Sequence, residues 1–200
     1  IELGAKVIAM SDSNGCIYDK NGIDLDEIKR IKEVERLRIK EYQKKYTGAE
    51  YLENTKGSTP KVYTIKADIV LPCATQNDIN LETAKILVNN GVIAVGEGAN
   101  MPTEIDAIHY LQQNKVLHAP AKAANAGGVA TSALEMSQNS MRYSWTFEEV
   151  DEKLDRIMTN IFKTCKDTAD KYGLGTDYLS GANIAAFNKV ADAMIAQGII

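Results

Sequence analysis

The sequence contains few of the residues that define metal-binding and disulfide-bonded proteins. Of its 200 residues, three are cysteine and two are histidine. Cys16, Cys73 and Cys165 are odd in number and form no Cys-x-x-Cys pair, which argues against a zinc site and a disulfide framework. We therefore expect no metal site and three buried or half-buried thiols, as in a protein of the reducing cytoplasm. A nucleophilic Cys73 is the alternative, and His109 and His118 are expected to be structural.

An excess of positive charge and a long hydrophobic run are also absent. The chain has 23 basic and 27 acidic residues and a net charge of −4, whereas a nucleic-acid surface needs a basic footprint to neutralise phosphates. No apolar run approaches the roughly 20 residues that span a bilayer. With 44% hydrophobic and 25% charged residues, the composition is that of a globular protein without nucleic-acid or membrane partners.

The opening residues are not expected to be a signal peptide. The chain begins with Ile1 rather than Met, and it shows no basic stretch, apolar stretch and cleavage site in succession. Residues 1–6 resemble the last turn of a helix that ends at Gly4. We therefore expect the polypeptide to begin upstream of Ile1.

Four short apolar runs predict the strands of a parallel sheet. They comprise residues 7–10, 69–71, 92–95 and 116–119. The runs are continuous rather than alternating, as in strands that are buried on both faces. The segments between them have apolar residues at helical spacing, namely 24–46, 80–91 and 103–114. This order predicts an α/β fold with a doubly wound parallel sheet that is Rossmann-like and incomplete at its N-terminal end.

After the last apolar run, only helices are predicted. One helix spans about 129–143, and a capping box formed by Thr146 and Glu149 starts the next. A last helix, rich in alanine, spans about 183–197. Basic and acidic residues alternate in the earlier helix over 24–46, which indicates a solvated, ion-paired surface rather than a phosphate-binding face.

The loops that follow the four apolar runs are rich in small residues, amides and hydroxyls. They comprise residues 11–15, 72–77, 96–100 and 120–125. Ligands bind at the carboxyl ends of parallel strands, small residues let a flat ligand approach the backbone, and amides both donate and accept hydrogen bonds. Four such loops at one edge of a sheet therefore predict a nucleotide-binding cleft.

The loop after the first run suggests which part of a dinucleotide would lie there. Asp12 is placed to hold the ribose hydroxyls of NAD, and Ser13 could donate a hydrogen bond to the extra phosphate of NADP. The alternative is that residues 11–15 form only a turn. A Gly-x-Gly-x-x-Gly fingerprint is missing in this chain, since Met101 stands where the third glycine of the run beginning at Gly96 would be.

The missing fingerprint is therefore expected upstream of the chain. In this interpretation, residues 1–125 form a dinucleotide-binding domain that lacks its first strand and its glycine fingerprint. Residues 126–200 form a helical segment that returns toward an absent substrate domain.

Six motifs, taken in order, cover essentially the whole chain. They are Ser-Asp-Ser-Asn-Gly at 11–15, Leu-Pro-Cys-Ala-Thr-Gln-Asn at 71–77, Glu-Gly-Ala-Asn-Met-Pro-Thr at 97–103, Lys-Ala-Ala-Asn-Ala-Gly-Gly-Val-Ala-Thr-Ser at 122–132, Gly-Ala-Asn-Ile-Ala at 181–185 and Ala-Asp-Ala-Met-Ile-Ala-Gln-Gly at 191–198. Together they resemble the C-terminal, cofactor-binding part of hexameric bacterial-type glutamate dehydrogenases, in the glutamate/leucine/phenylalanine/valine dehydrogenase family.

The resemblance implies an NAD(P)-dependent oxidoreductase that reversibly deaminates L-glutamate to 2-oxoglutarate and ammonia, and that is a cytoplasmic homohexamer when full length. It implies cofactor-binding roles for Ala74, Thr75, Gln76, Asn100 and Asn125. Val129 and Ser132 would face the substrate, and Asn125 would also lie near it. The family's catalytic lysine and aspartate belong to the absent domain, so no catalytic residue is assigned here and the isolated fragment is expected to be inactive.

Two choices within the family depend on single serines. Position 13 holds a serine and not an acidic residue, and this favours NADP over NAD. Ser132 favours glutamate, because its hydroxyl can bind a carboxylate, whereas relatives that act on branched-chain or aromatic amino acids present an apolar surface there. The alternatives are a leucine, valine or phenylalanine dehydrogenase of the same family and a non-catalytic nucleotide-binding module.

Overall fold

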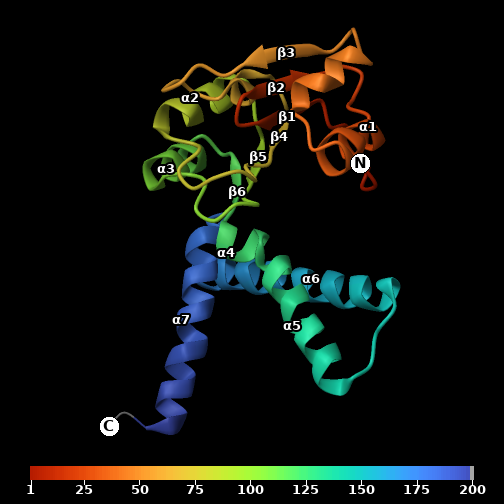
Figure 1. Cartoon of the computed structure of the whole chain (residues 1–200). Coiled ribbons are helices and arrows are strands. Elements are labelled where there is room, and N and C mark those ends of the chain that lie inside the picture. The colour runs from red at the N-terminus through yellow and green to blue at the C-terminus, as the bar shows by residue number, and fades with distance from the viewer. Residues whose placement is uncertain (199–200) are drawn as a thin grey trace. The chain divides into compact units, whose positions relative to one another are not determined.

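The computed structural model describes residues 1–198 and contains two compact units (Figure 1). The first unit comprises Ile1–Val70 and Leu81–Val92. The second comprises Leu71–Asn80 and the chain from Ile93 onward. The structure has two sheets, one of strands in the order β1-β2-β3 and one in the order β4-β5-β6, and each unit is described by itself.

The first unit contains an antiparallel sheet of three strands in the order β1-β2-β3. The strands are β1 (Ala9–Asp12), β2 (Gly15–Tyr18) and β3 (Glu50–Glu53). Residue Ile17 of the central strand pairs with Met10 on one side and with Tyr51 on the other. The apolar run over 7–10 was expected in the parallel sheet, and this expectation was wrong, because the turn that follows it folds the chain straight back into β2.

The helix predicted over 24–46 is broken into three short pieces. They are α1 (Leu25–Lys29), one π-helical turn η1 (Arg30–Val34) and a 3₁₀ helix η2 (Ile39–Lys44). The break falls at Arg36, which has a left-handed backbone with φ of 54° and so cannot continue a right-handed helix. Burial explains the break, because it lets both halves direct apolar side chains into one core with β2. That core comprises Ile17, Ile23, Ile28, Ile31, Ile39, Tyr42 and Ala49.

The rest of the first unit is a 3₁₀ helix, a short strand and an α-helix. These are η3 (Lys61–Thr64), β4 (Ile69–Val70) and α2 (Leu81–Asn89). The predicted helix end at Gly91 is confirmed by its φ of 81° and by its N–H, which bonds back to the Val88 carbonyl at 3.0 Å.

The second unit begins with two parallel strands joined through a helix. Strand β5 (Ala94–Gly96) pairs with β6 (Leu117–Ala119), and α3 (Ile105–Gln113) connects them. Val95 and His118, which are opposite each other, are both about 1% exposed. The strands and the helix occur where the sequence predicts them, within two residues at each end.

Four helices complete the second unit: α4 (Ala121–Ala124), α5 (Ala126–Met141), α6 (Phe147–Lys171) and α7 (Tyr178–Gln197). The predicted capping box of α6 is confirmed, because the Thr146 hydroxyl accepts from the Glu149 N–H and the Glu149 carboxylate accepts from the Thr146 N–H. Helix α6 packs against α5 and α7 (Figure 1).

Three smaller expectations have clear outcomes. Ile1 to Gly4 form a turn rather than the end of a helix, although Gly4 has the expected positive φ. Cys16 and Cys165 are buried thiols as expected, whereas Cys73 is exposed, because its loop extends beyond the strands. Among the helices of residues 1–198, none combines the length and the apolar character needed to cross a membrane.

Candidate functional site

Three loops of the second unit meet at the carboxyl ends of β5 and β6. The Pro72 carbonyl accepts the N–H groups of Gly98 and Ala99 at 3.1 and 3.0 Å, which joins the loop over 71–80 to the loop after β5. The Asn77 N–H donates to the Met101 carbonyl at 2.9 Å. These backbone bonds hold two of the small-residue loops together, as expected for loops at one edge of a sheet.

Gly98 is needed for this close approach. A Cβ at Gly98 would lie 2.5 Å from the Cys73 sulfur, a distance that side chains do not tolerate. The next residues of the same loop, Ala74, Thr75 and Gln76, are all exposed. The structure therefore presents this predicted cofactor-binding run on the surface beside the glycine-containing loop.

The third loop is joined to the second by two asparagines. The Asn125 side-chain amide donates to the Asn100 side-chain oxygen at 2.7 Å and to the Ala99 carbonyl at 3.2 Å. Within residues 1–198, the Asn100 amide nitrogen and the Asn125 side-chain oxygen have no hydrogen-bond partner from the protein. One donor group, the NH2 of Asn100, and one acceptor atom, the side-chain oxygen of Asn125, thus remain available to a ligand that carries a carboxamide or a hydroxyl.

Val129 and Ser132 follow Asn125 on helix α5. They are one helical turn apart, so they lie on the same face, and both are exposed, Val129 by 72%. The Ser132 hydroxyl donates to the Gly128 carbonyl of its own helix at 3.2 Å. That bond lies within one turn of the helix. By rotating about χ1, the hydroxyl can give it up and donate instead to a carboxylate of a ligand.

Asp12 and Ser13 belong to the first unit, so the structure groups them apart from the other seven predicted residues. Their loop is the turn between β1 and β2 of the antiparallel sheet, and not the end of a parallel strand, because β1 pairs with β2. The expectation of four loops at one edge of a single sheet was therefore wrong for the loop over 11–15. The other three loops lie in the second unit.

The Asp12 carboxylate is engaged within its own unit. One oxygen accepts from the Asn14 N–H at 3.0 Å, and the other accepts from the Ile39 N–H, which begins η2, at 2.9 Å. The Lys32 ammonium lies 3.6 Å away. Burial acts to raise the pKa of Asp12, but these two N–H groups, with Lys32 and Arg38, lower it overall. Asp12 is therefore a carboxylate at neutral pH, and it fixes the turn on η2.

Ser13 lies beside a cation that the sequence did not connect with it. The Arg38 guanidinium donates to the Ser13 hydroxyl at 2.8 Å, across 25 residues of sequence. A cavity of about 400 Å³ opens at Ser13. It is lined by Ser13, Asn14, Glu53, Asn54, Thr55, Lys56, Ser58 and Pro60. Hydroxyls, amides and nearby cations are groups that bind a phosphate or a ribose.

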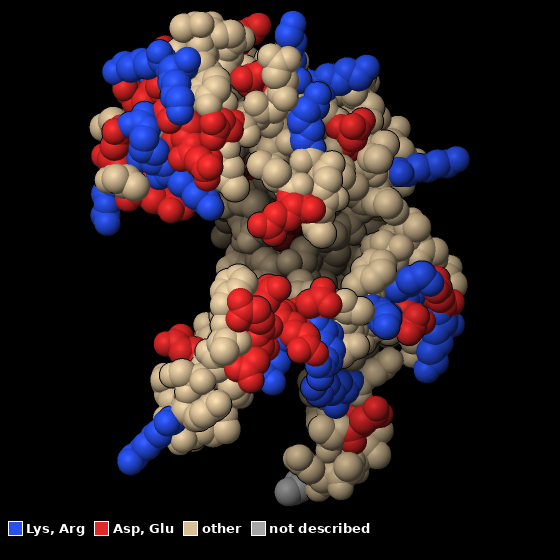
Figure 2. Space-filling view, turned by 90° about the vertical axis from the view of Figure 1, so that its right-hand side faces the viewer, with Lys and Arg blue, Asp and Glu red and all other residues tan. Residues whose placement is uncertain are grey.

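Most other basic residues of this region behave as the alternating charge pattern predicts. Figure 2 shows Lys and Arg interspersed with Asp and Glu on the face drawn, rather than gathered in one basic patch. Arg30 and Lys45 pair with the Glu27 carboxylate at 2.5 and 3.1 Å. Arg38 and Lys32 differ from these because they approach the turn at Asp12 and Ser13. The alternation of charge carries no signal that could have distinguished them.

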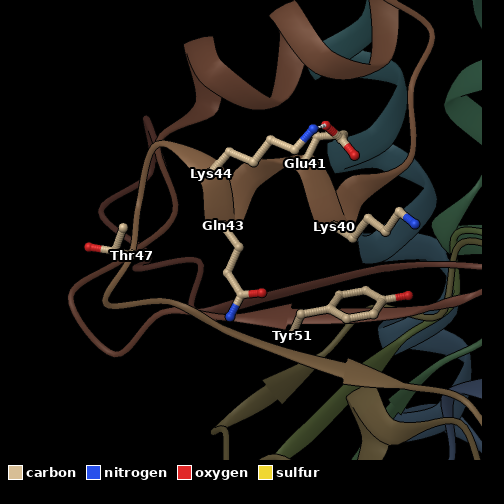
Figure 3. Close-up of a pocket in the computed structure, with 6 residues that line it drawn as sticks. All are labelled: Lys40, Glu41, Gln43, Lys44, Thr47 and Tyr51. Carbon is tan, nitrogen blue, oxygen red and sulfur yellow. Dashed lines mark ion pairs between the residues drawn. The ribbon is translucent and has the colours of Figure 1, made fainter.

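A second cavity, of about 640 Å³, also lies in the first unit. Figure 3 shows Lys44 directed at Glu41, with which it forms an ion pair, and Gln43 directed toward strand β3. The Gln43 amide donates to the Ala49 carbonyl at 2.9 Å. Of the lining residues, Lys44 and Glu41 are thus engaged with each other within η2, and Gln43 joins η2 to the residue before β3. No predicted site residue contributes to the lining.

Comparison with known proteins places the chain in a family. Residues 1–198 match the glutamate/leucine/phenylalanine/valine dehydrogenase family. The NAD(P)-specific glutamate dehydrogenase of Xylanibacter ruminicola is 55% identical over 206 residues, and the NADP-specific glutamate dehydrogenase of Escherichia coli is 48% identical over 203. Both matches cover 100% of this chain but only 44% of the relative, so the chain spans less than half the length of these relatives.

Solved structures give the same picture. The glutamate dehydrogenase of Plasmodium falciparum matches with a TM-score of 0.91 and 47% identity, over 100% of this chain and 42% of that chain. This likeness confirms the α/β fold class expected from the order of strands and helices.

Proposed function

Because the chain belongs to the glutamate/leucine/phenylalanine/valine dehydrogenase family, as its motifs indicate, we propose that it is the cofactor-binding part of an NAD(P)-dependent glutamate dehydrogenase. The enzyme would deaminate L-glutamate reversibly to 2-oxoglutarate and ammonia. The nicotinamide cofactor, when bound, accepts a hydride from the amino acid and returns it in the reverse direction. The residues of this chain bind and orient the two reactants.

The observation that carries the proposal is the asparagine pair where three loops meet. The Asn125 amide nitrogen lies 2.7 Å from the Asn100 side-chain oxygen. The Asn100 amide nitrogen and the Asn125 side-chain oxygen are left to a ligand. In the proposal, these groups hold the nicotinamide end of the cofactor, while Ala74, Thr75 and Gln76 lie along the dinucleotide. Asn125 also reaches the amino-acid end of the substrate, since it immediately precedes α5.

Val129 and Ser132 select the substrate in this proposal. The Ser132 hydroxyl donates a hydrogen bond to the side-chain carboxylate of glutamate, and Val129 packs against the methylene groups. A hydroxyl that binds a carboxylate discriminates strongly against substrates that lack one, since the polar group would then be left unpaired. A leucine, valine or phenylalanine dehydrogenase is the second candidate, and no described residue favours it over glutamate.

We further propose that the cofactor is NADP rather than NAD. Asp12 would hold the adenosine ribose, and Ser13 with Arg38 and Lys32 would bind the 2′-phosphate. A phosphate near two cations and a hydroxyl gains charge-assisted hydrogen bonds that a ribose hydroxyl does not. The Escherichia coli relative is named NADP-specific, in line with this choice, whereas the Xylanibacter ruminicola relative is named NAD(P)-specific, a name that includes both cofactors.

In the proposal, the catalytic groups belong to the substrate domain of the full-length enzyme and not to residues 1–200. Lys122 is not proposed as a catalytic lysine, because its ammonium donates to the Asn183 side chain of α7. In the proposal, residues 1–125 act as the dinucleotide-binding domain and residues 126–200 as a helical segment toward a substrate domain. The fragment alone is then inactive, and the full-length enzyme is a cytoplasmic homohexamer.

The substrate assignment is tested on the full-length polypeptide with glutamate, leucine, valine and phenylalanine. Ser132→Ala is expected to lower kcat/KM for glutamate about 10- to 100-fold, because it removes a hydrogen bond to a charged group. Ser137→Ala is the matched control, since Ser137 is exposed on the same helix and makes the same type of bond to its own helix, at 2.9 Å to Ala133. A wild-type enzyme that prefers leucine, valine or phenylalanine would overturn the assignment.

The cofactor assignment is tested by the ratio of the KM values for NAD and NADP. Arg38→Gln is expected to raise the KM for NADP about tenfold and to leave that for NAD nearly unchanged, because only NADP carries the 2′-phosphate. Arg156→Gln is the control, since Arg156 forms an exposed pair with Glu152 on α6. Equal changes for NAD and NADP in Arg38→Gln would contradict the proposed phosphate site.

A further inference from the structure

A buried carboxylate, that of Glu97, contacts the segment of the second unit that carries Asn125 and lies in the same loop as Asn100. Glu97 follows strand β5 and is only 3% exposed. One of its oxygens accepts the Ala121 N–H at 2.7 Å, and the other lies 3.1 Å from Nε2 of His118, which is 1% exposed. The Glu97 N–H also donates to the Ala119 carbonyl at 3.1 Å. Glu97 therefore connects the end of β5 with both the end of β6 and the start of α4.

The charge on this carboxylate is maintained by its surroundings. Burial acts to raise the pKa of Glu97, yet the pKa is lowered overall by His118, by the Thr103 hydroxyl and by the Ala121 N–H. An isolated buried carboxylate would instead take up a proton. Within residues 1–198, His118 is the one basic side chain at ion-pair distance from Glu97. The charge thus depends on His118 and on the start of α4.

The two segments that Glu97 joins are the two that carry the asparagines. Asn100 lies three residues after Glu97, and Asn125 lies four residues after Ala121. The Asn125 N–H donates to the Ala121 carbonyl at 2.9 Å, which closes the single turn of α4. The loops are therefore joined twice, by Glu97 at their bases and by the Asn100–Asn125 amide bond nearer the surface.

We propose that Glu97 is a positioning residue that sets the Asn100–Asn125 pair for cofactor binding, and that His118 holds the Glu97 carboxylate in place. This inference rests on the proposed function, since it takes Asn125 as a cofactor contact. Glu97 itself is buried and acts through the backbone of α4. Loss of its charge lets α4 shift relative to the loop after β5, and Asn125 then leaves the orientation that the cofactor needs.

The test measures the Kd of NADPH for the full-length polypeptide by fluorescence titration. Glu97→Gln keeps the size of the side chain and one acceptor oxygen but removes the charge. It is expected to raise the Kd about tenfold, as loss of a charge-assisted contact does. Glu82→Gln is the matched control, because Glu82 forms an exposed pair with Lys85 on α2, and its Kd is expected to equal that of the wild type.

A double-mutant cycle separates positioning from a general loss of structure. If Glu97 acts through Asn125, Glu97→Gln raises the Kd about tenfold in the wild type but less than about twofold in an Asn125→Ala background. A structural role alone would weaken binding equally in both backgrounds, and that result overturns the inference. An unchanged Kd in Glu97→Gln also overturns it.

A second variant covers the case in which Glu97→Gln does not fold. His118→Phe keeps a ring in the same place but leaves Glu97 without its imidazole neighbour, and it is expected to raise the Kd about threefold, again only when Asn125 is present. An equal Kd for His118→Phe and the wild type overturns the inference. A wild-type polypeptide that binds no NADPH contradicts the proposed function itself, so the two failures are distinguishable.

Discussion

Among the described residues 1–198, each of the two units buries one glutamate, and the groups that surround the two carboxylates differ. Glu27 of the first unit is 2% exposed and pairs with Arg30 and Lys45, two cations from the same charged stretch of chain. Glu97 of the second unit is 3% exposed and has one histidine and one backbone N–H. The first arrangement only ties α1 to the end of η2. The second connects two strands to the loops of the proposed site. Because the Glu97 carboxylate has fewer partners than that of Glu27, loss of one partner can shift those loops.

The core of the first unit and the helices α5 and α7 of the second differ in how their apolar side chains are covered. In the first unit, seven residues form one buried core around Ile17. In the second, α5 has no buried residue and α7 buries only Gly181 and Ala182. Residues Val129, Met136, Phe187 and Ile195 are each at least 70% exposed. The sheet of the first unit is thus stabilised by burial, whereas α7 depends on close backbone contact with α6.

Acid is expected to have the largest effect, because it neutralises every paired carboxylate at once. Hydrogen bonds from Arg30, with Lys45 nearby, lower the pKa of Glu27 from 4.5 to about 2. A lowered pKa means that the stabilisation is fully present above about pH 4.5 and is lost as the pH falls toward 2. Urea unfolding of Glu27→Gln between pH 5 and 2.5, followed by circular dichroism, should depend less on pH than that of the wild type.

The exposed Glu148→Gln serves as the control for this acid series and should retain the wild-type slope. Parallel slopes for Glu27→Gln and the wild type would mean that Glu27 is not an ion-paired carboxylate in solution. The lowered pKa of Glu97 has the same sign, so Glu97→Gln should also lose pH dependence below about pH 4.5.

The difference in burial predicts unequal effects for the same substitution. Ile17→Ala removes a fully buried side chain and should lower the free energy of unfolding by about 2–5 kcal/mol. Ile195→Ala removes a side chain that is 71% exposed and should change it by less than about 0.5 kcal/mol. Chemical denaturation of the two variants checks the comparison. Equal losses of unfolding free energy in the two variants would show that the exposed face of α7 is covered in solution.

The contact between α6 and α7 should tolerate no side chain at Gly181. A Cβ there would overlap the Cys165 carbonyl and lie 3.1 Å from the Ala169 side chain. Gly181→Val is expected to destabilise the second unit by about 1–3 kcal/mol, because the helices must separate. Trp145, the single tryptophan, precedes α6 and reports this unfolding by fluorescence. Gly48→Ala, at a position with nothing within 4 Å, should leave the transition unchanged.

Helix caps should show the smallest effects, and these should be similar in the two units. Asp24 caps α1 and Thr146 caps α6, each by accepting the N–H three residues later. Asp24→Ala and Thr146→Ala should each cost about 1 kcal/mol in thermal unfolding. A much larger cost for Asp24→Ala would indicate that its contact with the Tyr46 hydroxyl contributes as well as the cap.

Sequence reasoning succeeded where a local signal specifies the structure. The apolar runs located β5 and β6 within two residues, and Thr146 with Glu149 located the start of α6. The small-residue loops after these strands do meet, because parallel strands bring their carboxyl ends to one edge. The same reasoning failed for the chain from Val7 to Tyr46. A continuous apolar run suits a parallel strand and a hairpin strand equally, and helical spacing does not reveal a break at Arg36.

The sequence by itself therefore determined the family, the α/β class and the residue types at the proposed site, since these follow from composition, periodicity and motifs. Only the tertiary structure decided which of these residues are neighbours. The contact of Arg38 with Ser13 spans 25 residues, and those of Glu97 with His118 and Ala121 span 21 and 24. Such contacts depend on how separate elements pack, and no local pattern along the chain records that packing.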